Sequence, residues 1–147
     1  MVLSRPPLAD AGRRSGARPA PGARCALIAG ADPRIRLLLR TVLEVGGMEV
    51  VEATSQGEVL SWLAAATPPD VVILDVALPH FSGVATLSFM RRHPRLASVP
   101  VVVLTSFGDP PEHTRYRQSG ATAVLSKPFS AQRLLETVSS VSASGTH

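Results

Sequence analysis

Apolar residues follow two different patterns between residues 25 and 141. Short unbroken apolar runs alternate with longer segments in which apolar residues recur every three or four positions. An unbroken run indicates a strand that is covered on both faces of a parallel sheet, and the longer period indicates an amphipathic helix. The runs predict strands over residues 26–29, 48–53, 70–75, 99–104 and 123–125. The periodic segments predict a first helix that begins after Asp32 and ends at the glycines 46 and 47, and a second that begins after Ser55 and is stopped by the prolines 68 and 69. A third helix is expected through Leu87 and Met90, and two more over about residues 112–119 and 130–141.

Five strands that alternate with five helices through short loops predict an α/β fold with a doubly wound five-stranded parallel sheet. We expect a flavodoxin-like strand order of 2-1-3-4-5 with helices on both faces. In that order the carboxyl ends of the first and third strands meet at the switch point, where such sheets bind ligands.

Polar residues mark where the first two helices begin and end. Asp32 is followed by Pro33, an order typical of an N-cap and the first helical position. Ser55 and Glu58 have the spacing of a capping box. Glycines at 46 and 47 predict the end of the first helix.

Positive charge is concentrated at the start of the chain. The 147 residues carry a net charge of +4, and residues 1–24 account for it with five arginines and one aspartate. Residues 1–23 are rich in Arg, Pro and Gly and poor in apolar residues, which predicts a disordered tail. We expect one domain over residues 24–143 and a short tail over 144–147. Because this domain is nearly neutral, its charge gives no reason to expect nucleic-acid binding by the fold itself.

The chain has one cysteine, Cys25, which excludes an internal disulfide framework and a cysteine-rich zinc cluster. No segment approaches the ~20 apolar residues of a membrane span. The N-terminus lacks the apolar centre of a secretory signal. We therefore expect a cytoplasmic protein that does not associate with membranes.

Polar residues follow three of the predicted strands at the edge where ligands bind. Asp75 ends the third strand, Thr105 and Ser106 end the fourth, and Lys127 follows the fifth. A carboxylate beside a lysine and a hydroxyl can attack phosphorus as a nucleophile while the other two groups hold the transferred phosphoryl group. This set predicts phosphoryl chemistry at Asp75.

The segments DVVILDVALPHFSG, VVVLTS and VLSKPFS occur in this order and resemble the response regulator receiver domain of two-component signalling. The resemblance covers about residues 25–141. It implies that Asp75 is the phospho-acceptor, that Thr105 is the switch hydroxyl and that Lys127 is the lysine of the pocket, with a cis peptide bond before Pro128. It also implies that the protein is no independent enzyme and at most catalyses its own phosphorylation and dephosphorylation.

The sequence departs from the family at the metal site. The resemblance implies Mg²⁺ held by the acceptor aspartate, by a backbone carbonyl, here that of Ala77, and by two adjacent acidic residues that end the first strand. Gly30 and Ala31 stand at the positions of that acidic pair. Asp32, the next residue, is either a substitute ligand or simply the N-cap of the helix. The expected Mg²⁺ site therefore consists of Asp75, Asp32 and the Ala77 carbonyl, without the pair that normally completes it.

A second departure concerns the output of the signal. Receiver domains usually carry an aromatic residue three positions before the lysine, and Val124 occupies that position. A valine cannot make the rotation that couples this position to the switch hydroxyl. The face formed by residues 112–119, 123–125 and 130–141 is therefore expected to respond differently from that of a typical receiver.

Three functions remain open from the sequence. The first is an atypical receiver that acts through protein–protein contacts of this face, with a histidine kinase or another signalling protein or as a homodimer, and with Mg²⁺-dependent phosphorylation weak or lost. The second is a working response regulator in which a histidine kinase phosphorylates Asp75. The third is a nucleic-acid accessory protein that binds through its arginine-rich tail with steep salt dependence.

Overall fold

The computed structural model describes residues 24–64, 67–77, 81–106 and 110–145. Five strands within them form one parallel sheet in the order β2-β1-β3-β4-β5, so the predicted fold class and strand order are confirmed. The predicted N-terminal tail and the loop residues 78–80 lie outside the described residues. The strands are β1 (Cys25–Ala29), β2 (Glu49–Ala53), β3 (Val71–Asp75), β4 (Val101–Thr105) and β5 (Ala123–Ser126).

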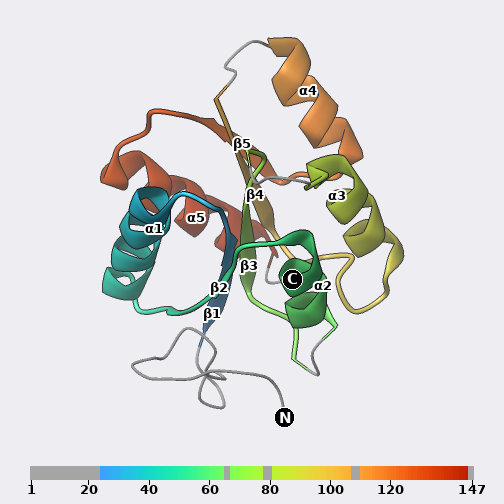
Figure 1. The fold of residues 1–147 in the computed structure, drawn as a ribbon, viewed down its shortest axis with the longest axis horizontal. Helices are drawn as coiled ribbons and strands as arrows, with labels where there is room; N and C mark the ends of the chain where they lie inside the picture. Colours follow the sequence, from blue (N-terminus) through green and yellow to red (C-terminus); the bar gives the residue numbers. More distant parts are fainter. Residues whose placement is uncertain (1–23, 65–66, 78–80, 107–109, 146–147) are drawn as a thin grey trace.

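The helices cover both faces of this sheet, as Figure 1 shows. Helices α1 and α5 lie on one face, and α2, α3 and α4 lie on the other. Each face buries its own apolar core, so the inner strands β3 and β4 are buried at every position. This explains why these two strands read as unbroken apolar runs. The helices are α1 (Pro33–Val45), α2 (Gln56–Leu63), α3 (Gly83–Arg92), α4 (Pro110–Ser119) and α5 (Ala131–Gly145).

The predicted helix starts are confirmed for α1 and α2. Asp32 is the N-cap of α1, where its Oδ1 accepts a hydrogen bond of 2.9 Å from the Arg34 N–H. The Ser55 hydroxyl accepts the Glu58 N–H at 3.1 Å. The Glu58 carboxylate accepts the backbone N–H of Thr54 at 2.7 Å, one residue before the position that a standard capping box uses.

The fourth strand begins two residues later than predicted. Its predicted start, Val99, belongs instead to a turn in which its N–H donates to the carbonyl of Leu96 at 3.1 Å. Pro100 then has no N–H to offer a neighbouring strand, so the ladder begins at Val101. At the other end of the chain, α5 continues to Gly145, past its predicted end at residue 141.

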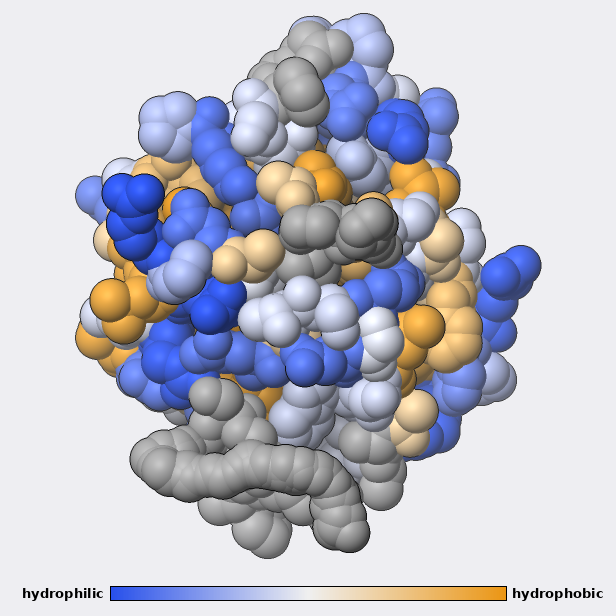
Figure 2. Space-filling view, in the orientation of Figure 1, coloured by the Kyte–Doolittle hydropathy of each residue, from blue (hydrophilic) through white to orange (hydrophobic). Residues whose placement is uncertain are grey.

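Figure 2 shows apolar residues at the left edge of the molecule, in the region where α1 lies in Figure 1. Among the residues that the structure describes, the exposed large apolar ones are Leu37 and Val45 of α1, at 65% and 79%. None of the helices in the described residues is long and apolar enough to cross a membrane.

Candidate functional site

The carboxyl ends of β3 and β5 bring Asp75 and Lys127 into direct contact. The ammonium Nζ of Lys127 lies 2.8 Å from Oδ2 of Asp75. The Asp75 side chain is only 3% exposed, and that of Lys127 is 20% exposed. The other carboxylate oxygen, Oδ1, accepts the backbone N–H of Ala77 at 2.9 Å. Both oxygens of Asp75 are therefore hydrogen-bonded within the protein, and the carboxylate charge is balanced by a lysine.

Thr105 ends β4, the strand between the two that carry this ion pair. Thr105 is fully buried, and its backbone carbonyl accepts the N–H of Lys127 at 2.8 Å. The peptide bond between Lys127 and Pro128 is cis, as the resemblance implied. The three residues chosen from the sequence thus lie at one edge of the sheet.

The end of β1 is held by an arginine that the sequence analysis did not single out. Nη1 of Arg36, on the first turn of α1, donates to the carbonyls of Gly30 and Ala31, both at 3.0 Å. Its Nε donates to the Glu52 carboxylate of β2 at 2.9 Å. The guanidinium therefore caps the two positions at which the family carries its acidic pair.

Gly30 lies close to both Arg36 and the candidate phospho-acceptor Asp75. A Cβ atom built on Gly30 would lie 3.8 Å from Cγ of Arg36, 3.6 Å from Cβ of Asp75 and 3.8 Å from its Oδ2. These are ordinary van der Waals distances, so a Cβ atom at residue 30 would meet no steric obstacle.

The residues at this edge do not fit an ordinary Mg²⁺ site. Mg²⁺ needs near-octahedral oxygen ligands and is usually bound through one or two carboxylates. Asp75 supplies the carboxylate here, and both of its oxygens already have partners. The carboxylate of Asp32 serves as the α1 N-cap. Within the described ranges, no three His, Cys, Asp or Glu residues gather in a way that would hold a metal ion.

Val124 is buried in β5 with 7% exposure and packs in the core cluster that also contains Tyr116 of α4. Next to it on the sheet edge, the hydroxyl of Ser126 lies 2.8 Å from Nε2 of His113. This contact joins β5 to α4. The two elements are therefore connected by a buried apolar cluster and by a polar contact.

Comparison with known proteins identifies the family and agrees with the observed fold. A family model described as the response regulator receiver domain matches residues 26–139. The chain is 34% identical over 103 residues to the polar-differentiation response regulator DivK of Brucella ovis, a match that covers 70% of this chain and 83% of that protein.

Solved structures agree with this match. A response regulator structure from Chloroflexus aurantiacus is 32% identical, with a TM-score of 0.77, and covers 82% of this chain and 98% of that one. The chemotaxis response regulator CheY4 of Vibrio cholerae is 28% identical, with a TM-score of 0.75, and covers 81% and 98%. Members of this family are phospho-acceptor signalling modules rather than conventional enzymes, and their partners are histidine kinases and other signalling proteins. The chain belongs to the response regulator receiver domain family.

Proposed function

We propose that this protein is an atypical receiver, in which Mg²⁺-dependent phosphorylation at Asp75 is weak or lost and signalling proceeds through protein–protein contacts. The observation that carries the proposal is the end of β1. Gly30 and Ala31 supply no carboxylate there, and their carbonyls accept hydrogen bonds from Arg36. A guanidinium that is itself paired with Glu52 lies against these carbonyls, and neither residue offers a carboxylate that would attract a divalent cation.

The charge balance of the pocket supports this proposal. Three neighbouring carboxylates would repel one another and create a need for a divalent cation. Asp75 instead has a lysine at 2.8 Å and a backbone N–H donor at 2.9 Å. A single carboxylate with these partners is stable without a metal, and an incoming phosphoryl group would have to separate it from Lys127.

We infer that the surface of α4, β5 and α5 is the contact face for a signalling partner, such as a histidine kinase, or for a second copy of the chain. The contact between His113 and Ser126 and the burial of Val124 support a fixed arrangement of α4 on β5. A face with one arrangement would be recognised without prior phosphorylation. The cytoplasmic location expected from the sequence suits such a role.

A second candidate is a working response regulator that a histidine kinase phosphorylates on Asp75. The observation that favours it is the intact set of Asp75, Thr105 and Lys127 at one edge of the sheet. This function needs a metal ligand beyond Asp75, and Asp32 would have to leave its N-cap position to provide one. The third hypothesis, nucleic-acid binding by the tail, concerns residues outside the described ranges and stays a prediction.

The deciding experiment is intact-mass measurement after incubation with acetyl phosphate and Mg²⁺. We expect no phosphoryl adduct, or only a trace, on the wild-type protein and on Asp75→Ala. We expect an adduct on the double variant Gly30→Asp with Ala31→Asp, because a Cβ atom at residue 30 meets only ordinary contacts and the pair restores the Mg²⁺ ligands.

Two comparisons make the result specific. The double variant Gly30→Asn with Ala31→Asn has nearly the same shape without the charges, and it should gain no adduct. A strong adduct on wild type that Asp75→Ala abolishes would overturn the proposal and establish the second candidate. No adduct on any variant would contradict the role given to the missing carboxylates, while leaving the wild type inactive toward acetyl phosphate.

A further inference from the structure

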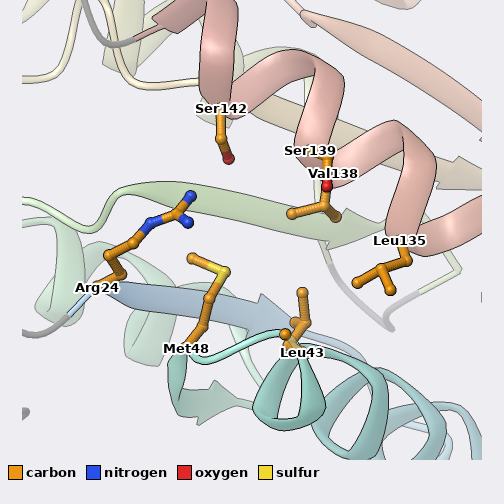
Figure 3. Close-up of a pocket in the computed structure, with 8 residues that line it drawn as sticks. Arg24, Leu43, Met48, Leu135, Val138, Ser139 and Ser142 are labelled. Carbon is orange, nitrogen blue, oxygen red and sulfur yellow. The ribbon is translucent and has the colours of Figure 1, made fainter.

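A cavity of about 410 Å³ lies between α1 and α5, at the edge of the sheet opposite Asp75 (Figure 3). Its lining residues include Arg24, which precedes β1, and Met48, which precedes β2. The amino ends of the strands therefore form its floor, and the carboxyl ends form the receiver pocket. Its volume falls in the range of small-molecule sites, roughly 300 to 1,000 Å³.

The cavity contains a buried hydroxyl that has no hydrogen-bond partner. Ser142 of α5 is 4% exposed, and its Oγ has no partner among the described residues. Helical hydroxyls usually donate to the carbonyl four residues earlier, as Ser119 and Thr137 do in this protein at 3.0 and 2.8 Å. Figure 3 shows that the Ser142 hydroxyl points toward the cavity instead. A buried polar atom without a partner costs free energy that a ligand atom would recover.

The other walls combine a cation with apolar surface. Figure 3 shows the Arg24 side chain extending from the start of β1 across the cavity toward Ser142. Leu135 of α5, which is only partly buried, and Met48 supply the apolar wall, and Leu43 and Val138 behind them belong to the buried core. A guanidinium donates hydrogen bonds and can accept none, so it selects an anionic oxygen ligand, and carboxylates suit its planar fork.

We propose that this cavity binds a small organic carboxylate with an apolar body. The carboxylate would accept hydrogen bonds from Arg24 and Ser142, and the apolar body would lie against Met48 and Leu135. The ligand would contact α5, which is also part of the contact face inferred above. The site itself is independent of phosphorylation, because it lies at the other edge of the sheet from Asp75.

The test is a titration of the isotope-labelled full chain with hexanoate, followed through backbone amide NMR shifts. We expect saturating shifts at the amides around Leu43, Met48 and Ser142, and none around Asp75. Hexanol has the same apolar body without the charge, and we expect it to bind at least about tenfold more weakly because its hydroxyl offers Arg24 no anion.

Variants separate a specific site from weak adsorption. Arg24→Gln should weaken hexanoate binding about tenfold, and Ser142→Ala should weaken it several-fold. Arg34→Gln removes an equal charge from an exposed position at the other end of α1 and should leave binding unchanged. Absence of saturation, equal binding of hexanol, or full binding by Arg24→Gln would each overturn the proposal. The amide spectra of the variants show in the same experiment whether each one is folded.

Discussion

At the scale of single residues, we expect the loss of Lys127 to cost more unfolding free energy than the loss of the Asp75 charge. The Asp75 side chain is 3% exposed, whereas that of Lys127 is 20% exposed and reaches water. Lys127→Met leaves a buried carboxylate without its cation, which we expect to cost about 3 kcal/mol of unfolding free energy. Asp75→Asn keeps the acceptor for the Ala77 N–H and leaves a partly hydrated ammonium, at a cost of about 1 kcal/mol.

Urea denaturation of the two variants and the wild type measures this difference. A carboxylate in a cluster of like charges would behave in the opposite way, because removing it would relieve repulsion and raise stability. An Asp75→Asn protein more stable than wild type would therefore contradict the simple ion pair described for this pocket.

Cys25 provides a prediction about pH. Burial, with smaller contributions from the negative charges of Asp70 and Glu49, raises the pKa of the Cys25 thiol to about 11. Since the thiolate is the reactive form, alkylation by iodoacetamide should be slow at neutral pH and should accelerate as the pH rises toward 11. Asp70→Asn should shift this rate profile to lower pH, because it removes a negative charge next to the thiol.

Mass spectrometry of the alkylated protein gives the rate at each pH. Glu136→Gln, which removes a carboxylate from α5 far along the chain from Cys25, serves as the matched control and should leave the profile in place. An unchanged profile for Asp70→Asn would show that this carboxylate has no effect on the thiol.

The sequence identified Asp75, Thr105 and Lys127 because each ends or directly follows a strand of one parallel sheet. The same reasoning could not find Arg36. Its place on a polar position of α1 looks like ordinary solvent exposure, and its contacts with Gly30, Ala31 and Glu52 depend on how α1 packs beside β2. Ser142 was missed for a related reason, because nothing in a sequence tells whether a helical hydroxyl will find a partner.

At the scale of elements, the end of α4 depends on a glycine that faces an arginine. Gly120 has a φ of +119°, and a Cβ atom there would lie 2.7 Å from Cγ of Arg91. Nε of Arg91 donates to the Gly120 carbonyl at 2.9 Å, and its Nη1 donates to the Val99 carbonyl at 2.8 Å. Displacing Arg91 would therefore disturb the link between α3, the turn before β4, and α4.

We expect Gly120→Ala to lower the unfolding free energy by about 2 to 3 kcal/mol, from backbone strain together with the clash. Gly47→Ala is the matched control, because Gly47 has a φ of +91° and nothing within 4 Å of its added Cβ. It should lose only the strain, about 1 kcal/mol. Equal losses in thermal or urea denaturation would show that Arg91 moves aside without cost.

Element boundaries were predictable where capping chemistry marks them and less so elsewhere. Asp32 and Ser55 mark the starts of α1 and α2 in the sequence, and both are N-caps in the structure. The start of β4 was placed too early because Val99 extends the apolar run, although its N–H is used in a turn. Apolar character alone does not show which amides join a ladder.

At the scale of the whole molecule, the charge distribution at the receiver pocket predicts how stability responds to metal ions. A ligand stabilises a protein only if it binds the folded state more tightly than the unfolded state. We expect millimolar Mg²⁺ to leave the melting temperature of the wild type unchanged. The double variant Gly30→Asp with Ala31→Asp should melt lower in a chelator and recover by several degrees when Mg²⁺ is added.

A thermal scan of both proteins in chelator and in Mg²⁺ supplies the comparison, with Ca²⁺-free buffer throughout. A Mg²⁺-dependent rise in the melting temperature of the wild type would mean that Asp75 has recruited other oxygen ligands, and it would count against the metal-free interpretation.

The fold itself could be predicted from the sequence because five strand signals alternate with five helix signals, an order that few topologies satisfy.

The ion pair between Lys127 and Asp75 has a consequence for timing. In a phosphorylated switch, the lifetime of the acyl phosphate sets how long a signal persists. If phosphorylation at Asp75 is lost, as proposed above, the ion pair at 2.8 Å persists and no acyl phosphate limits how long the signal lasts. Such a protein would signal whenever it is present in the cell. The rates at which the cell synthesises and degrades the chain would then determine both the strength and the duration of the response.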